Sequence, residues 1–217
     1  MMADQAALNF ASGTILGIDL DNTILSYDQA ILAVALRMKL VDAQAPRDKR
    51  RLRDLIRSGP EGDVAWQRVQ AEIYGPAIGH AVLIDGVIRF LTRCRQHGVT
   101  VHIVSHKTKR ANYDTTGTDL RFAALGWLEN NGIFSLDGPG LPRANVWFAD
   151  TRAEKVDRIV DLGCSWFIDD LLEVFEEPSF PSSIGRILFD PTAAASVMPG
   201  MLRMADWPSI ERWAFGG

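Results

Sequence analysis

The sequence predicts an α/β fold in which a parallel sheet lies between layers of helices. Short apolar, β-branched runs typical of buried strands alternate with amphipathic segments typical of helices through most of the chain. Strands separated by helices are joined by right-handed crossovers, which make the strands parallel and cover both faces of the sheet. Three predicted strands end directly in acidic or hydroxyl residues. Ligands bind at the carboxyl edge of such sheets, so the same pattern predicts a site there.

The first strand is the apolar run 15–18, and two carboxylates, Asp19 and Asp21, follow it. Because side chains alternate along a strand, both acids leave its end on a common side. Two carboxylates so close together require a cation or a shared proton. The run therefore predicts a divalent-metal site or a catalytic acid pair, and acids that cap the following helix are the structural alternative.

A small all-helical insert is predicted after this strand. Apolar spacing and the Gly and Pro residues that interrupt it indicate helices over 26–41, from 45 to 58 and over 63–74. A segment of about fifty residues is too small to hold a large core by itself. We therefore expect an α/β core formed by residues 1–26 and 81–217, with residues 27–80 as a helical insert.

The remainder of the chain alternates between predicted helices and strands. Ser105 follows the second strand, Lys155 lies within a helical pattern, and Asp169 and Asp170 end a third strand. Trp207 and Trp213 are expected to hold a C-terminal helix against the core. The expected elements are helix 82–97, strand 99–104, helix 120–130, strand 146–148, helix 151–162, strand 165–168, a helix from 171 and strand 186–189.

This ordered set of residues resembles the four motifs of the haloacid dehalogenase (HAD) superfamily. The set is the Asp19-x-Asp21-x-Thr23 stretch, a strand that ends in Ser105, then Lys155, then a strand that ends in Asp169-Asp170. The resemblance covers residues from about 14 to 191. It implies a Rossmann-like core. It also implies that the insert is a cap, since HAD enzymes often carry a helical cap between the first two motifs that covers the site and selects substrate.

Under this resemblance, Asp19 is the nucleophile and forms an aspartyl-phosphate, while Asp21 is the general acid and base. The family pattern assigns phosphate binding to Ser105 and Lys155. Lys107 and Lys109 also follow Ser105 closely and compete for the cationic role, but Lys155 alone precedes the Asp-Asp strand at the expected place.

An acid-rich set without His or Cys suits Mg²⁺. The resemblance assigns the ion to Asp19, the backbone carbonyl of Asp21 and one carboxylate of the Asp169-Asp170 pair. Asp170 is the expected direct ligand, with Asp169 behind it orienting Lys155.

The second aspartate favours a phosphatase over a dehalogenase, because only an ester's leaving group must be protonated. The expected substrate is a small phosphorylated metabolite. A phosphotransferase or phosphomutase with the same intermediate, and a non-catalytic protein that binds a phosphate ligand, are the alternatives.

Composition excludes several other classes of protein. The net charge of −4 and a single basic cluster, 47–57, argue against nucleic-acid binding. Cys94 and Cys164 suggest reduced, buried thiols rather than a disulfide framework or a zinc site. No signal peptide or membrane-spanning run is recognisable, so a cytoplasmic location without membrane association is expected. The residues do not indicate an oligomeric state.

Overall fold

The computed structural model describes residues 8–47, 49–193, 195 and 197–216. The chain divides into two compact units. The core unit comprises the described parts of 1–24, 84–106 and 132–217, and the helical unit comprises the described parts of 25–83 and 107–131. The core unit contains a six-stranded sheet and the helical unit a two-stranded one.

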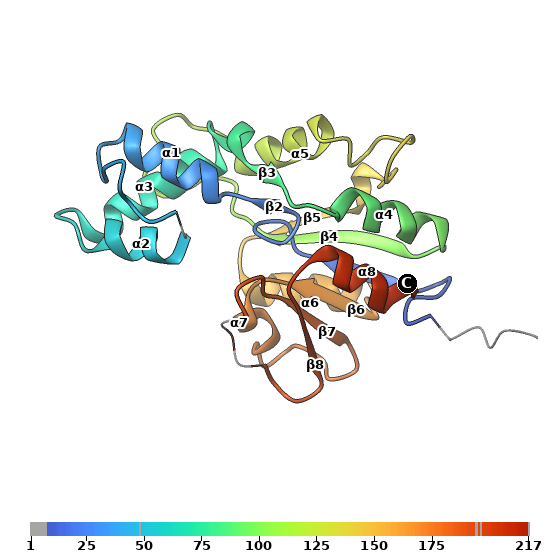
Figure 1. Ribbon diagram of the computed structural model, residues 1–217. Coiled ribbons are helices and arrows are strands. Elements are labelled where there is room, and N and C mark those ends of the chain that lie inside the picture. Colours follow the sequence, from blue (N-terminus) through green and yellow to red (C-terminus); the bar gives the residue numbers. More distant parts are fainter. Residues whose placement is uncertain (1–7, 48, 194, 196, 217) are drawn as a thin grey trace, which may run out of the picture. The chain divides into compact units, whose positions relative to one another are not determined.

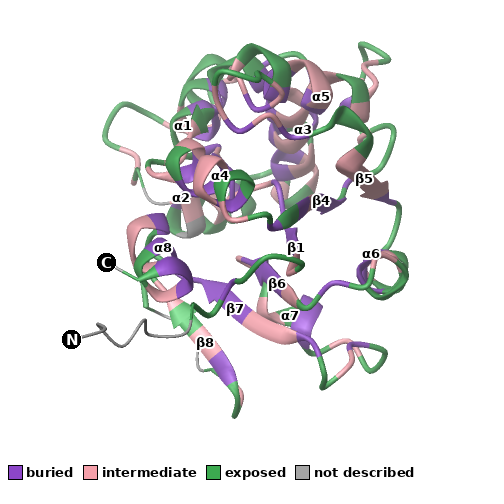
Figure 2. Ribbon diagram, turned by 90° about the vertical axis from the view of Figure 1, so that its right-hand side faces the viewer, coloured by how far each residue is buried: buried purple, intermediate pink, exposed green. Residues whose placement is uncertain are grey.

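Every neighbouring pair of strands in the core sheet is parallel, in the order β5-β4-β1-β6-β7-β8, which the labels of Figure 2 follow and part of which Figure 1 shows from another side. From β1 the chain proceeds outward through β4 to β5, then returns and proceeds outward from β6 on the other side of β1. The strand order therefore reverses beside β1, which is where open parallel sheets bind ligands. The strands are β1 (Ile15–Ile18), β4 (Thr100–His106), β5 (Val146–Ala149), β6 (Trp166–Asp169), β7 (Gly185–Phe189) and β8 (Met201–Met204).

Helices cover both faces of this sheet, as the sequence predicts. Helix α4 contacts β4 and α8, whereas α6 contacts β4 and β5, and Figure 2 shows α8 and α6 on opposite sides of β6 and β7. Beneath α6 and α7, Val156, Ile159 and Phe175 are buried in one apolar cluster with Phe167 of β6. The helical elements are α4 (Val87–Gln96), a 3-10 turn η2 (Arg143–Asn145), α6 (Arg152–Asp161), α7 (Leu172–Phe175) and α8 (Trp207–Phe215).

The C-terminal helix packs against the core through the two tryptophans, which confirms that expectation. The Trp207 ring is fully buried, and its centroid lies 4.8 Å from that of Phe90 on α4. The Trp213 ring meets Trp166 edge to face, with centroids 4.8 Å apart. Such aromatic contacts contribute about 0.5–1.5 kcal/mol each beyond the area they bury.

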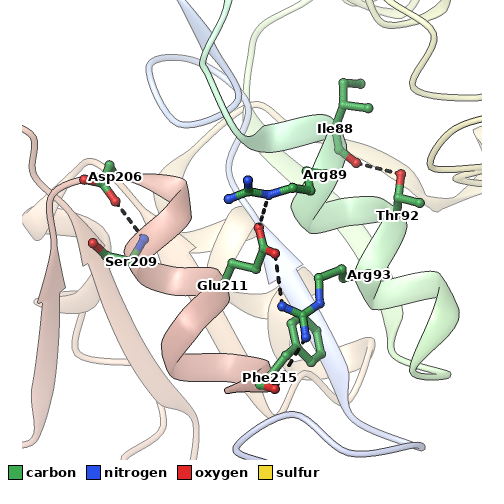
Figure 3. A network of polar contacts seen from close by, with 8 residues as sticks. All are labelled: Ile88, Arg89, Thr92, Arg93, Asp206, Ser209, Glu211 and Phe215. Carbon is green, nitrogen blue, oxygen red and sulfur yellow. Dashed lines mark hydrogen bonds and ion pairs between the residues drawn. The ribbon is translucent and has the colours of Figure 1, made fainter. Parts of the chain in front are cut away.

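A buried carboxylate adds a polar link between α4 and α8 (Figure 3). Glu211 accepts hydrogen bonds from Arg89 Nε at 2.6 Å and from Arg93 Nη1 at 3.0 Å. Arg93 also donates to the Phe215 carbonyl at 3.5 Å. Both ends of α8 are thus held, one by the Trp207 ring and the other by this network.

The helical unit combines the predicted insert with a segment from after β4. The two short strands pair antiparallel, Leu25 with Leu83 and Ser26 with Val82. The insert therefore begins and ends at the same two-stranded ribbon. Helix α3 contacts α1, α2 and α5. The division at residues 27–80 remains a prediction, because α5 groups with these helices. The elements are β2 (Leu25–Ser26), α1 (Asp28–Arg37), α2 (Lys49–Arg57), α3 (Gly62–Tyr74), a 3-10 turn η1 (Ile78–His80), β3 (Val82–Leu83) and α5 (Leu120–Asn130).

One local prediction was wrong. The helix expected over 82–97 begins only at Val87, because Val82 and Leu83 pair with β2 and Gly86, at φ +88°, takes a left-handed conformation at the helix start. Strand β8 was not predicted. No described helix is both long and apolar enough to span a bilayer.

Candidate active site

The candidate site lies at the carboxyl ends of three adjacent strands of the core unit. In the sheet register Ile18 stands beside both Ile103 of β4 and Ile168 of β6. Asp19 continues this pairing, since its backbone N–H donates to the Ile168 carbonyl at 2.9 Å. Asp19, Ser105 and Asp169 therefore meet at one edge because each follows or ends a strand in register, as the strand pattern predicts.

The turn after Asp19 is held by hydrogen bonds from distant parts of the core unit. Asn22 has φ +64°, a conformation that Asn tolerates better than most residues. The Ile24 N–H donates back to the Leu20 carbonyl at 2.9 Å. Trp207 Nε1 of α8 donates to the Thr23 carbonyl at 2.9 Å. This indole bond is a structural role that the sequence did not suggest, and it ties the C-terminal helix to the loop that carries Asp21.

Lys155 is positioned by the start of α6. Thr151 caps that helix, and its hydroxyl accepts the Glu154 N–H at 3.1 Å. One turn later, Lys155 Nζ donates to Asp19 Oδ1 at 2.6 Å and to Asp169 Oδ2 at 2.7 Å. The side chains of this lysine and of both acids are at least nine-tenths buried.

Asp169 is itself held in place, because its other oxygen accepts the Leu171 N–H at 2.9 Å. It therefore faces Lys155 with one oxygen and the backbone with the other.

The buried charges shift one another's pKa. Burial of the Asp19 carboxyl, helped by the nearby charges of Asp169 and Asp21, outweighs the attraction of Lys155 and raises the pKa of Asp19 to about 7. Burial alone would lower the pKa of the Lys155 ammonium, but the two facing carboxylates outweigh it and raise that pKa above its usual value. The lysine is therefore a cation at neutral pH, and a further cation beside Asp19 would favour its ionised form.

Three carboxylates of this site are close enough to share an ion. One oxygen each from Asp19, Asp169 and Asp170 lie within 4.8 Å of one another. Oxygen-only donors suit a hard cation such as Mg²⁺. The donor set therefore fits the ion expected from the sequence. Asp21 is half-buried on the loop after β1, and its charge is felt by Asp19.

Two buried hydroxyls stand out at this edge. The Ser105 side-chain oxygen is buried, as is that of Thr23, and neither has a hydrogen-bond partner among the described residues. Buried polar atoms are nearly always hydrogen-bonded. A partnerless hydroxyl at the end of β4 is therefore available to a ligand. The neighbouring His106 is engaged, since its Nε2 pairs with the Asp150 carbonyl at 3.0 Å.

Lys107, which competed with Lys155 for the cationic role in the sequence, is also buried. Lys107 is only 4% exposed and lies in the helical unit, with its Nζ 4.6 Å from the centre of the Tyr74 ring. Burial of a lysine next to Ser105 was not readable from the sequence, because the partner ring comes from α3.

The chain resembles solved structures of one superfamily over nearly its full length. A HAD-superfamily hydrolase from Ehrlichia chaffeensis matches with a TM-score of 0.55 and 12% identity, over 94% of this chain and 97% of its own. The HAD-hydrolase YfnB from Bacillus subtilis, solved with bound magnesium, matches with a TM-score of 0.54 and 14% identity over 92% and 97% of the two chains. The chain has the fold of the HAD-superfamily hydrolases.

The HAD fold confirms the predicted Rossmann-like architecture, but it is shared by more than one activity. A structure described as a dehalogenase matches with a TM-score of 0.54 and 10% identity over 91% and 95% of the two chains. No protein-family model and no curated protein matches the sequence. The choice of reaction must therefore come from the residues of this site.

Proposed function

We propose that this chain is a Mg²⁺-dependent phosphatase that hydrolyses a small phosphorylated metabolite through an aspartyl-phosphate on Asp19. The observation that carries the proposal is the placement of a buried Asp19, bonded to Lys155 at 2.6 Å, at the sheet edge that also holds the partnerless Ser105 hydroxyl. A nucleophile, a cation and a hydroxyl donor at one edge are what phosphoryl transfer requires.

The reaction has two steps in this proposal. A carboxylate oxygen of Asp19 attacks phosphorus while the bond to the leaving oxygen breaks, and Asp21 gives that oxygen a proton. Water then attacks the phosphorus of the aspartyl-phosphate and gives a proton to Asp21, while the bond between phosphorus and the Asp19 oxygen breaks, so that inorganic phosphate leaves and the Asp19 carboxylate is regenerated. Ser105 Oγ and Lys155 Nζ donate hydrogen bonds to the phosphoryl oxygens, whose charge is spread over them in the transition state.

Asp19, Asp170 and the backbone carbonyl of Asp21 would hold Mg²⁺, and Asp169 would orient Lys155. When bound, the ion supplies positive charge that lets an anionic carboxylate approach an anionic phosphate. Asp169 supports this division of roles, since both of its oxygens already accept hydrogen bonds from Lys155 and Leu171.

Asp21 favours a phosphatase over a dehalogenase. Displacement of a halide leaves a stable anion that needs no proton, whereas an alkoxide leaving group requires an acid. The acidic pair Asp169-Asp170 likewise belongs to a proposed metal site, and halide displacement needs no metal. The presence of both features in one site supports ester hydrolysis.

The test is phosphate release from a panel of sugar phosphates, nucleotides and phospho-acids, with Mg²⁺ or with EDTA. Wild type is compared with Asp19→Asn and with a control, Asp137→Asn, in which the same change is made at an exposed loop residue. We expect release only with Mg²⁺ and a loss of at least 10³-fold in Asp19→Asn, while the control keeps full activity.

Product analysis separates the alternatives. Transfer of the phosphoryl group to a second hydroxyl, with no free phosphate, would identify a phosphotransferase or mutase. Halide release from a 2-haloacid in EDTA would overturn the proposal in favour of a dehalogenase. Tight binding of phosphate esters without any turnover would identify a binding protein.

A further inference from the structure

A pocket of about 320 Å³ lies within the core unit, at the amino end of β4. This volume is at the lower end of the range for small-molecule sites. Its walls come from α4, from the first residues of β4 and from the loop that leads into η2. Ser105 lies near the other end of the same strand, about 16 Å from Thr100 at the usual rise of a strand. The pocket is therefore separate from the sheet edge that carries the candidate active site.

The pocket forms where β4 begins before its neighbour does. Strand β5 starts at Val146, opposite Ile103, so residues 100–102 of β4 have no partner in β5. Asn145 covers part of this open edge, since its Nδ2 donates to the Val101 carbonyl at 2.9 Å. A side chain of η2 thus takes the place of a strand, and the space beside it stays open.

Most of the pocket lining is apolar. A pocket of this composition favours an apolar ligand body, because apolar surface is removed from water when the ligand binds. No aromatic ring is among the described residues of the lining, so the pocket offers no platform on which a nucleobase would stack. An aliphatic body suits it better. The apolar lining residues are Leu91, Val99, Val101, Pro139, Leu141 and Pro142.

Arg95 is the single charged residue among the described residues that line the pocket. Its Nη1 donates to the Leu136 carbonyl at 2.8 Å. A Cβ added at Gly140, which has φ +61°, would lie 2.7 Å from the same nitrogen, so the guanidinium rests directly against this glycine. These two contacts hold the guanidinium at the pocket, and a group that is already in position loses less entropy when a ligand binds.

The charge of Arg95 has no acidic partner in the described part of the chain. Its one hydrogen bond there goes to a neutral carbonyl, which leaves Nε and Nη2 without a partner among the described residues. Two such N–H groups on one edge of a guanidinium match the two oxygens of a carboxylate. One cation also balances the single charge of a carboxylate, whereas a phosphate monoester carries nearly two charges.

We propose that this pocket binds a small monocarboxylate with an aliphatic body. The carboxylate accepts hydrogen bonds from Nε and Nη2 of Arg95, and the body lies against the apolar lining. Because the pocket is at the amino end of β4, its occupant is an accessory ligand and not the substrate of the candidate active site. The proposal goes beyond the phosphatase function and does not depend on it.

The test titrates ¹⁵N-labelled protein with 4-methylpentanoate and follows the backbone amide resonances. We expect the amides of Gly98, Thr100 and Gly140 to shift, with a dissociation constant of about 0.1–1 mM. The amide 4-methylpentanamide keeps the body without the charge, and acetate keeps the charge with little body. Each should bind at least about tenfold more weakly. The dianion 3-methylbutylphosphonate should also bind more weakly than the carboxylate.

Arg95→Met removes the guanidinium, and we expect it to weaken the binding of 4-methylpentanoate at least about tenfold. The control is Arg212→Met, because Arg212 is an exposed arginine of α8 that likewise donates to one neutral oxygen, Ser209 Oγ at 2.9 Å. That variant should bind as the wild type does. The comparison of 4-methylpentanoate with its amide is made on the wild type, so it holds even where Arg95→Met disturbs the loop.

Four results would each overturn the proposal. They are no shift at the pocket amides, binding of the amide or of acetate as tight as that of 4-methylpentanoate, tighter binding of the phosphonate at the same amides, and shifts confined to the surroundings of Asp19. Unchanged binding in a folded Arg95→Met would overturn it as well. None of these results bears on hydrolysis at Asp19, which the phosphate-release assay decides separately.

Discussion

Replacing Lys155 by Met tests the electrostatic construction of the site without reference to any substrate. Methionine keeps the length of the lysine stem and removes only the ammonium. The change leaves Asp19 and Asp169 buried, at 5% and 1% exposed, with no cation between them. We therefore expect the folded protein to lose stability even where no reaction is assayed.

The magnitude follows from the two hydrogen bonds that are lost. Lys155 Nζ lies 2.6 Å from Asp19 Oδ1 and 2.7 Å from Asp169 Oδ2, and charged hydrogen bonds contribute about 1.5–3 kcal/mol each. Removing one partner of a buried ion pair costs about 3–5 kcal/mol because the remaining charge is uncompensated. We expect a decrease of about 3–5 kcal/mol in the free energy of unfolding, which is a large part of a typical total of about 5–15 kcal/mol.

Urea unfolding followed by tryptophan fluorescence measures this loss. The experiment is done at pH 8 in EDTA, so that no divalent ion takes the place of the ammonium. With a denaturant slope of about 2–3 kcal/mol per molar, the midpoint should fall by roughly 1–2.5 M. The control is Lys109→Met, since the Lys109 side chain is 67% exposed and its nearest acid oxygen is 3.8 Å away. That change should cost less than about 0.5 kcal/mol.

A double variant decides whether charge is the cause. In Lys155→Met with Asp169→Asn one of the uncompensated charges is gone, so the double variant should be more stable than Lys155→Met alone. A loss below about 1 kcal/mol in the single variant, or a double variant that is less stable still, would refute the reasoning.

Two further predictions concern the packing that supports the site. A Cβ added at Gly17 would lie 2.5 Å from the Phe167 ring of the adjacent strand, so Gly17→Ala should destabilise the fold by about 1–3 kcal/mol, and an unchanged thermal midpoint would contradict this. Burial raises the pKa of the Glu211 carboxyl, but the hydrogen bonds from Arg89 and Arg93 outweigh burial and hold that pKa below 4.5. Its contribution of about 1–2 kcal/mol should be present above pH 4.5 and lost as the pH falls through the lower folded pKa, so the deficit of Glu211→Gln in urea unfolding should shrink in acid, and a deficit independent of pH would contradict this.

The sequence could predict which residues come together at the candidate site, because the positions of the strand ends follow from local rules. Asp19, Ser105 and Asp169 each stand at the end of an apolar run, and parallel strands bring such ends to one edge. Lys155 was assigned through the family resemblance, as the lysine that precedes the Asp-Asp strand at the expected place. Their contacts needed no knowledge of distant packing beyond the order of the strands.

Features that depend on non-local packing were missed. Strands β2 and β3 have two residues each, too few to show a period, and they pair only because the insert returns to its starting point. Strand β8 (Met201–Met204) is an edge strand whose residues are only partly buried, so its apolar signal is weak. The indole bond of Trp207 to the Thr23 carbonyl joins residues 184 positions apart.

The same distinction separates the candidate active site from the pocket of the helical unit. Phosphoryl chemistry needs a carboxylate, a hydroxyl and an ammonium at fixed strand and helix ends, and a short motif can encode each of them. The polar pocket lined by Gln67 and Asn112 in the helical unit instead depends on the hydrogen bond from Asn112 to Gln67, 45 positions earlier in the chain, and on α5 packing with the insert. No spacing rule links those residues, because only the folded helical unit brings them together. Substitutions in these helices can therefore reshape this pocket while the motif at the sheet edge stays the same.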